Sequence, residues 1–176
     1  MKKPLLALLA CSLMLPWAAR ADDPYLKLGV GWSRYDFGNI ADTGTVNNET
    51  GLSIAYGAKY DKVWGLEAGY VHFGRTREGI FDLNDNPSSL KAEALFLAGT
   101  GSMSLNPQAE VFGKLGLTVN RLSAAGESAT RTRMMAGLGA MWHLNKEWGA
   151  SLEYSYFGSI DSLSLSQTTL SAVYKF

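Results

Sequence analysis

Tyr25-Leu-Lys-Leu-Gly-Val-Gly-Trp-Ser33 is the stretch that decides the fold, because its residues alternate in character one by one. Its large apolar residues share one face of an extended chain: Leu26, Leu28, Val30 and Trp32. The residues between them share the other face: Lys27, Gly29, Gly31 and Ser33. A period of two residues is typical of a β-strand with two different faces. A soluble sheet could show this period, but a face of small residues and a lysine favours a narrow barrel lumen.

The same alternation recurs in seven further segments along the chain. They begin near Leu52, Leu66, Leu90, Val111, Leu138, Ala150 and Leu170. The segment from Leu90 to Leu105 is the least regular, since both of its faces carry apolar residues. There we expect Leu95 and Leu97 to point outward, with Ala94, Phe96 and Ala98 inward.

The connections between these segments alternate between short and long. The short ones are residues 61–63, 106–108 and 145–147, and the long ones are about 38–49, 74–89, 123–130 and 158–166. The long ones are rich in Gly, Asn, Asp, Ser and Thr, which favour loops. Short periplasmic turns and longer extracellular loops are typical of outer-membrane barrels. The sequence therefore predicts an all-β fold, an eight-stranded antiparallel up-and-down transmembrane β-barrel over residues 22–176. Both termini would be periplasmic and the long loops extracellular.

Aromatic residues cluster near the expected strand ends, as they do at the two interfaces of a membrane. Those expected on the short-turn side are Tyr25, Tyr60, Trp64, Trp142, Trp148, Tyr174 and Phe176. Those expected towards the long loops are Trp32, Tyr70 and Tyr156. Aromatic strand ends also occur in soluble sheets, so this pattern only supports the barrel.

Residues 1–21 have the features of a cleaved signal peptide. Lys2 and Lys3 are followed by the apolar run 5–15, and Ala19-Arg20-Ala21 suits a signal peptidase. An uncleaved anchor is an alternative, although the run is short for a membrane span and Pro16 interrupts it. Lipidation at Cys11 is another, although this cysteine lies in the middle of the apolar run.

Composition excludes several classes of function. Cys11 is the only cysteine, so residues 22–176 can form neither a disulfide nor a thiol nucleophile. Without Lys2, Lys3 and Arg20 the chain has 13 basic and 16 acidic residues, a net charge of −3. That balance gives no electrostatic footprint for nucleic acid.

The sequence closes on Leu170-Ser-Ala-Val-Tyr-Lys-Phe176. A last strand with a terminal Phe and apolar or aromatic residues at alternate positions resembles the assembly signal of outer-membrane barrels. The residues that carry this signal are Leu170, Tyr174 and Phe176. The resemblance implies the barrel-assembly machinery as a partner during biogenesis.

Three short segments resemble the OmpA-like transmembrane domain family: residues 64–70 (WGLEAGY), 111–117 (VFGKLGL) and 148–154 (WGASLEY). The resemblance covers all of residues 22–176. It implies a monomeric barrel in the bacterial outer membrane with a structural, adhesive or weakly pore-forming role. No counterpart of the peptidoglycan-binding domain that follows the barrel in OmpA is expected, and neither is a role as a cell-wall tether.

Charged residues at inward positions define the candidate site. Strand parity places these in the lumen: Lys27, Lys59, Glu67, Lys114, Arg133 and Glu153, with Lys175 as a further candidate. Buried charges need partners, so we expect Glu67 and Glu153 to pair with the lysines and with Arg133. An eight-stranded barrel is only wide enough for side chains to fill, which favours a structural plug over an ion-conducting gate.

Three cations are expected to face outward near the long loops: Arg34, Lys91 and Arg121. Cations facing lipid cost little near an interface, so these side chains are candidates for contact with the phosphates of lipopolysaccharide. The alternative is that they only extend to water.

The sequence does not favour an enzyme. Some eight-stranded barrels modify lipid A, and hydrolysis would require a Ser, a His and an acid within hydrogen-bond reach. His72 and His143 are expected at opposite ends of the barrel, so they cannot share a site. We expect no catalytic residue, no metal cluster and no cofactor. The long loops could bind a host surface, but they carry no motif that identifies a ligand.

Overall fold

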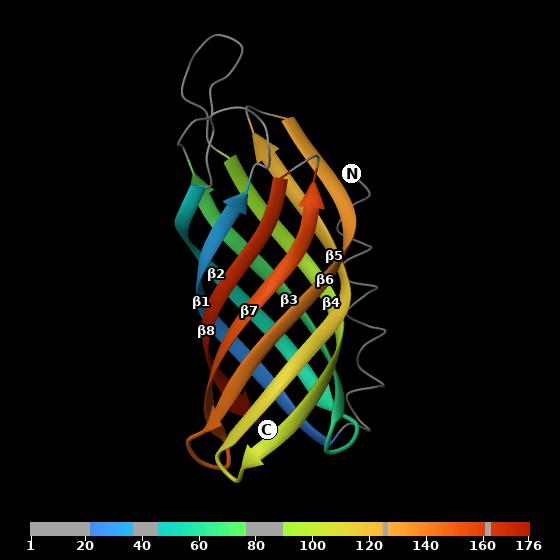
Figure 1. Cartoon of the computed structure of the whole chain (residues 1–176), viewed down its shortest axis with the longest axis vertical. Coiled ribbons are helices and arrows are strands. Elements are labelled where there is room, and N and C mark those ends of the chain that lie inside the picture. The colour runs from blue at the N-terminus through green and yellow to red at the C-terminus, as the bar shows by residue number, and fades with distance from the viewer. Residues whose placement is uncertain (1–21, 37–45, 77–89, 125–126, 161–162) are drawn as a thin grey trace.

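The computed structural model describes residues 22–36, 46–76, 90–124, 127–160 and 163–176, so the expected signal peptide lies outside the described residues. The chain forms eight strands: β1 (Asp22–Asp36), β2 (Val46–Lys59), β3 (Trp64–Thr76), β4 (Leu90–Asn106), β5 (Ala109–Ala124), β6 (Glu127–His143), β7 (Trp148–Ile160) and β8 (Leu163–Lys175). Figure 1 shows them tilted around a common axis. No helix in the described part of the chain is long and apolar enough to cross a membrane.

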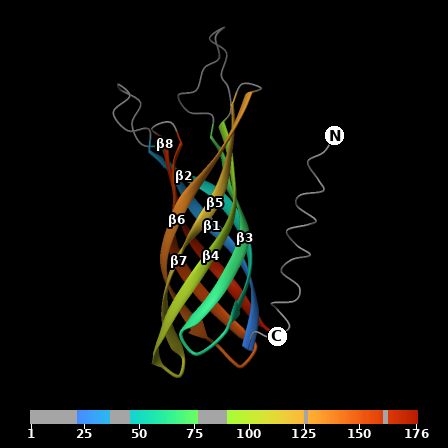
Figure 2. The same ribbon diagram turned by 90° about the vertical axis from the view of Figure 1, so that its right-hand side faces the viewer.

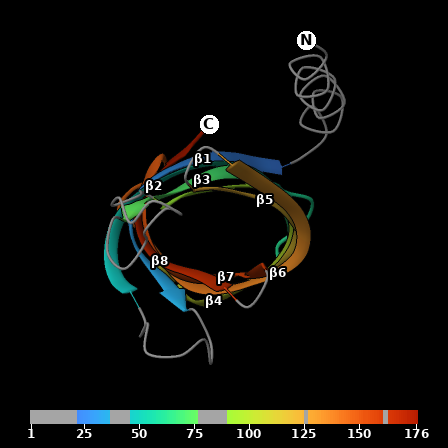
Figure 3. The same cartoon turned by 90° about the horizontal axis from the view of Figure 1, so that it is seen from above.

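The strands close into a barrel. Each strand pairs antiparallel with the next one along the chain, and β8 pairs with β1. Figure 2 shows the barrel from a second side, and Figure 3 shows it from above as a closed ring. Closure pairs the backbone groups of every strand on both sides, which is the condition for a sheet to lie in lipid. The predicted eight-stranded up-and-down barrel is confirmed.

The two faces of the barrel differ as the alternation predicts. Exposed outward residues include Leu28, Val30, Leu52, Leu115, Leu138, Leu152 and Leu170. Buried inward residues include Lys27, Ser33, Glu67, Lys114, Asn120 and Gln167. Apolar residues outside and polar residues inside reverse the arrangement of a soluble protein and are typical of a transmembrane barrel.

The least regular strand, β4, has the expected facing. Leu95 and Leu97 are 57% and 45% exposed on the outer face, whereas Ala94, Phe96 and Ala98 are buried in the lumen. Inside, the ring of Phe96 lies 6.3 Å from that of Phe157 on β7. The inward face of β4 is apolar because it joins a hydrophobic cluster within the lumen.

The three short turns share one local device. Asp61, Asn106 and Asn145 each accept hydrogen bonds on a side-chain oxygen from the backbone N–H groups two and three residues further on, at 2.7–2.9 Å. Such side-chain bonds favour a tight turn over a continuing strand. In the first turn, the N–H groups of Trp64 and Val63 hold the pKa of the Asp61 carboxyl below its usual value.

The opposite end of the barrel departs from the expectation. The connections expected over residues 123–130 and 158–166 are mostly strand, since β5 continues to Ala124 and β7 to Ile160. Ser123 pairs with Ser128, and Ser159 pairs with Ser164. Polar residues there suggested loops, but cross-strand hydrogen bonds from the neighbouring strand keep them extended. Most of the other two expected loops lies outside the described residues.

Two glycines bend strands at the long-loop end. Gly74 on β3 and Gly158 on β7 have φ values of 88° and 77°, and each lies within a shift of strand register. A phenylalanine precedes each glycine and points into the lumen. The rings of Phe73 and Phe157 lie 5.0 Å apart and nearly perpendicular, an arrangement that favours aromatic attraction. The two bulges therefore position an aromatic pair across the barrel.

The bulge at Gly158 should be intolerant of a side chain. We expect Gly158→Ala to lower the free energy of unfolding by about 1–3 kcal/mol, because a positive φ strains any other residue. The added Cβ would also lie 2.7 Å from Cβ of Arg133. The matched control is Gly99→Ala, whose Cβ would meet no atom closer than 3.9 Å. Urea unfolding followed by tryptophan fluorescence measures both variants, and equal losses would contradict the assignment of strain to the bulge.

Candidate functional site

The centre of the lumen holds a buried carboxylate between two ammonium groups. Glu67 is 1% exposed. Its oxygens lie 2.7 Å from Nζ of Lys27 and 2.9 Å from Nζ of Lys114. The hydroxyl of Tyr25 donates a further hydrogen bond to Glu67 at 2.9 Å. These partners replace the water that a carboxylate loses when it is buried.

A second carboxylate completes this network. Glu153 pairs with Lys114, lies 3.7 Å from Lys27 and accepts a hydrogen bond from Ser155. The four charged residues, hereafter the lumen network, come one each from β1, β3, β5 and β7. Inward residues of alternate strands meet at one level because the strands of a barrel are tilted and staggered. Two acids and two bases leave the lumen network formally neutral.

A second ion pair lies nearer the short turns. Nζ of Lys59 lies 2.7 Å from a carboxylate oxygen of Glu110 and donates another hydrogen bond to Ser102. His143 lies 3.8 Å from the same carboxylate. Glu110 is not among the lumen residues predicted from the sequence. Strand parity would have found it, since Glu110 is two positions before the inward Phe112 and four before Lys114.

Apolar side chains enclose the lumen network on both sides. Towards the short turns lie Tyr25, Phe112, Met141 and Val173. Towards the long-loop end lie Tyr35, Phe73, Phe96, Met135, Phe157 and Leu165. Nζ of Lys27 lies 4.3 Å from the ring centre of Phe112, and Nζ of Lys114 lies 4.6 Å from that of Phe96. Both ammonium groups therefore contact an aromatic face as well as carboxylates.

Little space remains between these side chains. The cavity at the lumen network measures about 20 Å³ and is bordered by Lys27, Glu67, Lys114 and Glu153 among others. That volume holds about one water molecule. At the level of the lumen network the interior is therefore packed by side chains.

Arg133 lies outside the lumen network, contrary to the expectation. Its Nε donates to the backbone carbonyl of Ser159 at 2.6 Å, at the long-loop end. Strand register explains the difference: Lys114 pairs with Gly137, and Arg133 lies four residues before Gly137 on β6, towards the long-loop end. At 3.3 Å per residue the offset is about 13 Å, too far for an ion pair with Glu67 or Glu153. Lys175 also makes no ion pair with any of the described residues.

The three outward cations do not form one site. Arg34 is exposed on β1 beside Ser166 of β8, whereas Lys91 and Arg121 lie on β4 and β5, across the barrel. Nζ of Lys91 is already 2.5 Å from a carboxylate oxygen of Glu93. Arg121 is the cross-strand partner of Glu93 and is exposed.

The residues of the expected assembly signal have outward positions on β8 and directly after its end. Leu170 and Phe176 are exposed, and the ring of Tyr174 lies 5.0 Å from Trp148 and 5.2 Å from Phe176. One expected member of the aromatic belt is elsewhere: Tyr25 is 5% exposed and points inward to Glu67. The alternation explains this, because Tyr25 has the parity of Lys27.

The two histidines lie at opposite ends of the barrel. His72 is on the outer face, 4.0 Å from Glu93, and His143 is near the short turns beside Glu110. Among the described residues, no group of three or more potential ligands could hold a metal ion. The chemistry that this site offers is charge pairing in a packed interior.

A closed barrel with an apolar outside and paired charges inside defines the class: an outer-membrane β-barrel protein. Residues 4–176 match the model of a protein family, the outer membrane protein beta-barrel domain. The chain belongs to this family. Outer membrane protein A of Yersinia pseudotuberculosis is 27% identical over 91% of this chain. The chain spans about half of that protein, 49% of its length.

Solved structures show the same fold. Ail, the attachment invasion locus protein of Yersinia pestis, has a TM-score of 0.62 and 19% identity over 89% of this chain and 99% of its own. Neisserial surface protein A has a TM-score of 0.65 and 12% identity, over 87% and 97%. OprG of Pseudomonas aeruginosa has a TM-score of 0.58 and 12% identity, over 89% and 97%.

The lumen network should depend on Glu67. We expect Glu67→Gln to lower the free energy of unfolding by about 3–5 kcal/mol, because it leaves two buried ammonium groups, Lys27 and Lys114, with the single carboxylate of Glu153. The same substitution at the partly exposed pair of Lys91 and Glu93, Glu93→Gln, should change it by less than about 1 kcal/mol. Urea midpoints in lipid vesicles compare the two. A shift for Glu67→Gln no larger than that for Glu93→Gln would contradict a network that stabilises the barrel.

Proposed function

We propose that this protein is a non-enzymatic outer-membrane scaffold with a sealed lumen, which acts through its outer surface. In this proposal the long-loop end is extracellular, both termini are periplasmic and the barrel is a monomer. The barrel-assembly machinery would insert it through the signal at Leu170, Tyr174 and Phe176. The role is structural or one of surface interaction.

The packing of the lumen is the observation that carries this proposal. A path for ions would have to pass the lumen network and the apolar residues on both sides of it. Among the described residues, the space left at the lumen network is the cavity of about 20 Å³. Ion pairs that neutralise each other leave no excess charge to attract an ion of either sign.

A narrow gated pore is the competing function. Opening it would require Lys27 and Lys114 to leave both carboxylates and find new ones. Breaking a buried pair costs about 3–5 kcal/mol when no replacement partner is present. A further buried carboxylate, that of Glu110, is already paired with Lys59. Opening would also require the pair of Phe73 and Phe157 to separate.

An enzyme is the least supported function. A hydrolase would bring a nucleophile, a base and an acid together. His72 has Glu93 nearby, but Nδ1 of His72 has no hydrogen-bond partner among the described residues. His143 points into a packed interior, where a lipid substrate has no access. Neither histidine therefore has the nucleophile and the acid that a hydrolase site requires.

With pore and enzyme less well supported, the surface proposed to interact is made of the long loops and the outward residues next to them, hereafter the rim. The likeness to Ail, whose name refers to attachment and invasion, is a likeness of fold and is compatible with a role in surface contact. Two exposed cations, Arg34 and Arg121, lie on opposite walls near the long-loop end. Each would meet the phosphates of lipopolysaccharide if this end is extracellular. Lys91 would contribute less because Glu93 already neutralises it.

Ion conduction tests the sealed lumen. We expect the refolded protein to give no discrete current steps in a planar bilayer, and Glu67→Gln to be equally silent, because the apolar packing remains. A gel shift between boiled and unboiled samples shows that each sample is folded. Discrete steps in the wild type that change with Glu67→Gln would contradict the sealed lumen and favour the gated pore.

Lipopolysaccharide retention tests the rim. We expect the double variant Arg34→Gln/Arg121→Gln to retain less lipopolysaccharide during purification, because each arginine lost removes a phosphate contact. Lys91→Gln is the control and should retain as much as the wild type. The amount bound per folded protein is the measurement. Unchanged retention in the double variant would remove lipopolysaccharide as a partner of these residues.

A further inference from the structure

The lipid-facing wall of the barrel carries a recess whose floor has no side chains. The recess measures about 660 Å³ on the outer face of β3 to β7. Its floor consists of Gly99 and Gly101 on β4 and Gly113 on β5. Its walls are apolar and include Trp64, Leu115, Leu138, Tyr154 and Tyr156.

The floor is continuous across the sheet. Gly101 pairs with Gly113 on one side and with Trp64 on the other. The indole of Trp64 lies over Gly101, where an added Cβ would come within 3.1 Å of the ring. A cross-strand aromatic ring that covers a glycine explains Gly101.

The other two glycines are not required by the packing of the chain. An added Cβ would meet no atom closer than 3.9 Å at Gly99 or 3.4 Å at Gly113, which is ordinary contact distance. Neither has the positive φ that favours glycine. Inside the lumen the situation differs, since a Cβ on Gly116 would run into the backbone of β4. Gly99 and Gly113 therefore leave open a space that a side chain could fill.

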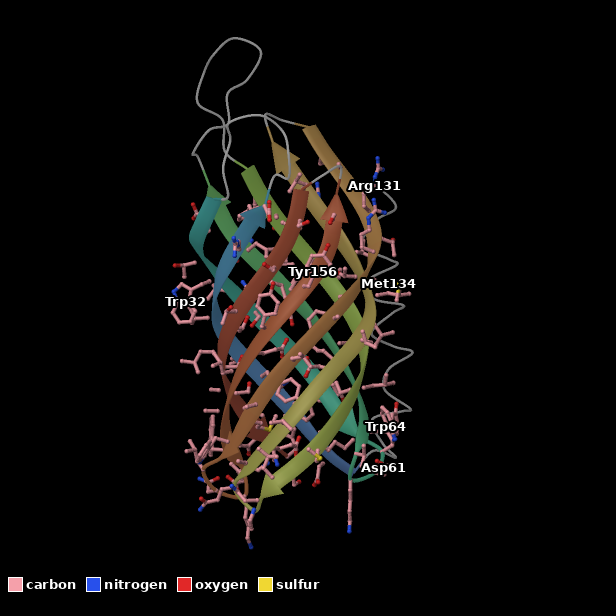
Figure 4. All side chains as sticks on the ribbon, in the orientation of Figure 1. Trp32, Asp61, Trp64, Arg131, Met134 and Tyr156 are labelled. Atoms are coloured by element: carbon pink, nitrogen blue, oxygen red, sulfur yellow. The ribbon has the colours of Figure 1, made fainter. Side chains whose placement is uncertain are left out.

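The recess runs from the short-turn end towards the middle of the barrel. Trp64 is the first residue of β3, next to the turn that contains Asp61. In Figure 4, Trp64 lies beside Asp61 at that end, and Tyr156 lies well above them. Crossing from β3 to β7 spans four strand spacings, about 19 Å. An elongated apolar molecule would fit along this recess if it enters from the membrane interface at the short-turn end.

The turn at the foot of the recess presents a cation. The carboxylate of Asp61 accepts hydrogen bonds from the backbone N–H groups of Val63 and Trp64, at 2.7 Å each. Lys62 is exposed, and no described carboxylate lies within ion-pair distance of it. An exposed ammonium two residues before an indole, in a turn at a membrane interface, suits an anionic headgroup with an apolar tail.

We propose that this recess binds one phospholipid from the leaflet at the short-turn end, with an acyl chain over Gly99 and Gly113 and the phosphate near Lys62. A second copy of the barrel fits less well. A twofold contact places the same patch on both partners, so two recesses would face each other and leave a void. A flexible acyl chain fills such a space without a matching ridge.

Native mass spectrometry tests this proposal. The full-length protein is reconstituted in vesicles of phosphatidylethanolamine and phosphatidylglycerol and transferred to mild detergent, and the retained phospholipid is counted. We expect one molecule on the wild type. The double variant Gly99→Leu/Gly113→Leu should retain about tenfold less, because leucines occupy the recess. The matched control fills two outward alanines outside it, Ala140→Leu/Ala172→Leu, and should retain as much as the wild type.

Headgroup selectivity gives a second, independent measurement. Lys62→Glu should lower retained phosphatidylglycerol relative to phosphatidylethanolamine, and Lys62→Arg should not. A gel shift confirms that every variant is folded. Equal retention by the recess variant and the alanine control would overturn the proposal. So would a wild type that retains no phospholipid or only lipopolysaccharide from native membranes, or a wild-type dimer peak that disappears in the recess variant.

Discussion

The pairing of β1 with β8 is the constraint on which the rest of the structure depends. In lipid every backbone N–H and C=O group needs a partner within the protein, and an open sheet would leave two rows unpaired. Closure solves this, but it also encloses a narrow space that side chains must fill. The inward face therefore combines small and polar residues with large apolar ones, and two of these, Phe73 and Phe157, meet across the lumen.

Filling that space with charges imposes a second condition. Glu67 and Glu153 are acceptable in the interior only because Lys27 and Lys114 reach both of them. Partners from four alternate strands tie distant parts of the chain to one register, since a slip of one residue would turn a charge towards lipid. If the interior is sealed, as we propose, the outer surface is the part of the molecule that can act on its surroundings.

Whether a side chain points into the lumen is much easier to predict from the sequence than which residue it pairs with. A period of two residues is enough to place Lys27, Glu67 and Lys114 inside the barrel. It does not show which level of the lumen each residue occupies, because that depends on strand stagger, and the predicted pairing of Arg133 is wrong for this reason. The place of Tyr25 at a strand end suggests the aromatic belt, although its parity points inward. The recess cannot be predicted in this way, since it depends on residues of several strands that meet on the outer wall.

The most direct test of a sealed, dry lumen is the exchange of lysine side-chain protons, observed by nitrogen-15 NMR at neutral pH. The structure predicts slow exchange and visible Nζ signals for Lys27 and Lys114, with contacts to the rings of Phe112 and Phe96. The exposed Lys62 and Lys146 serve as internal controls and should exchange too fast to be seen. Exchange at Lys27 and Lys114 as fast as at these controls would mean that water passes freely through the lumen, and would contradict the account.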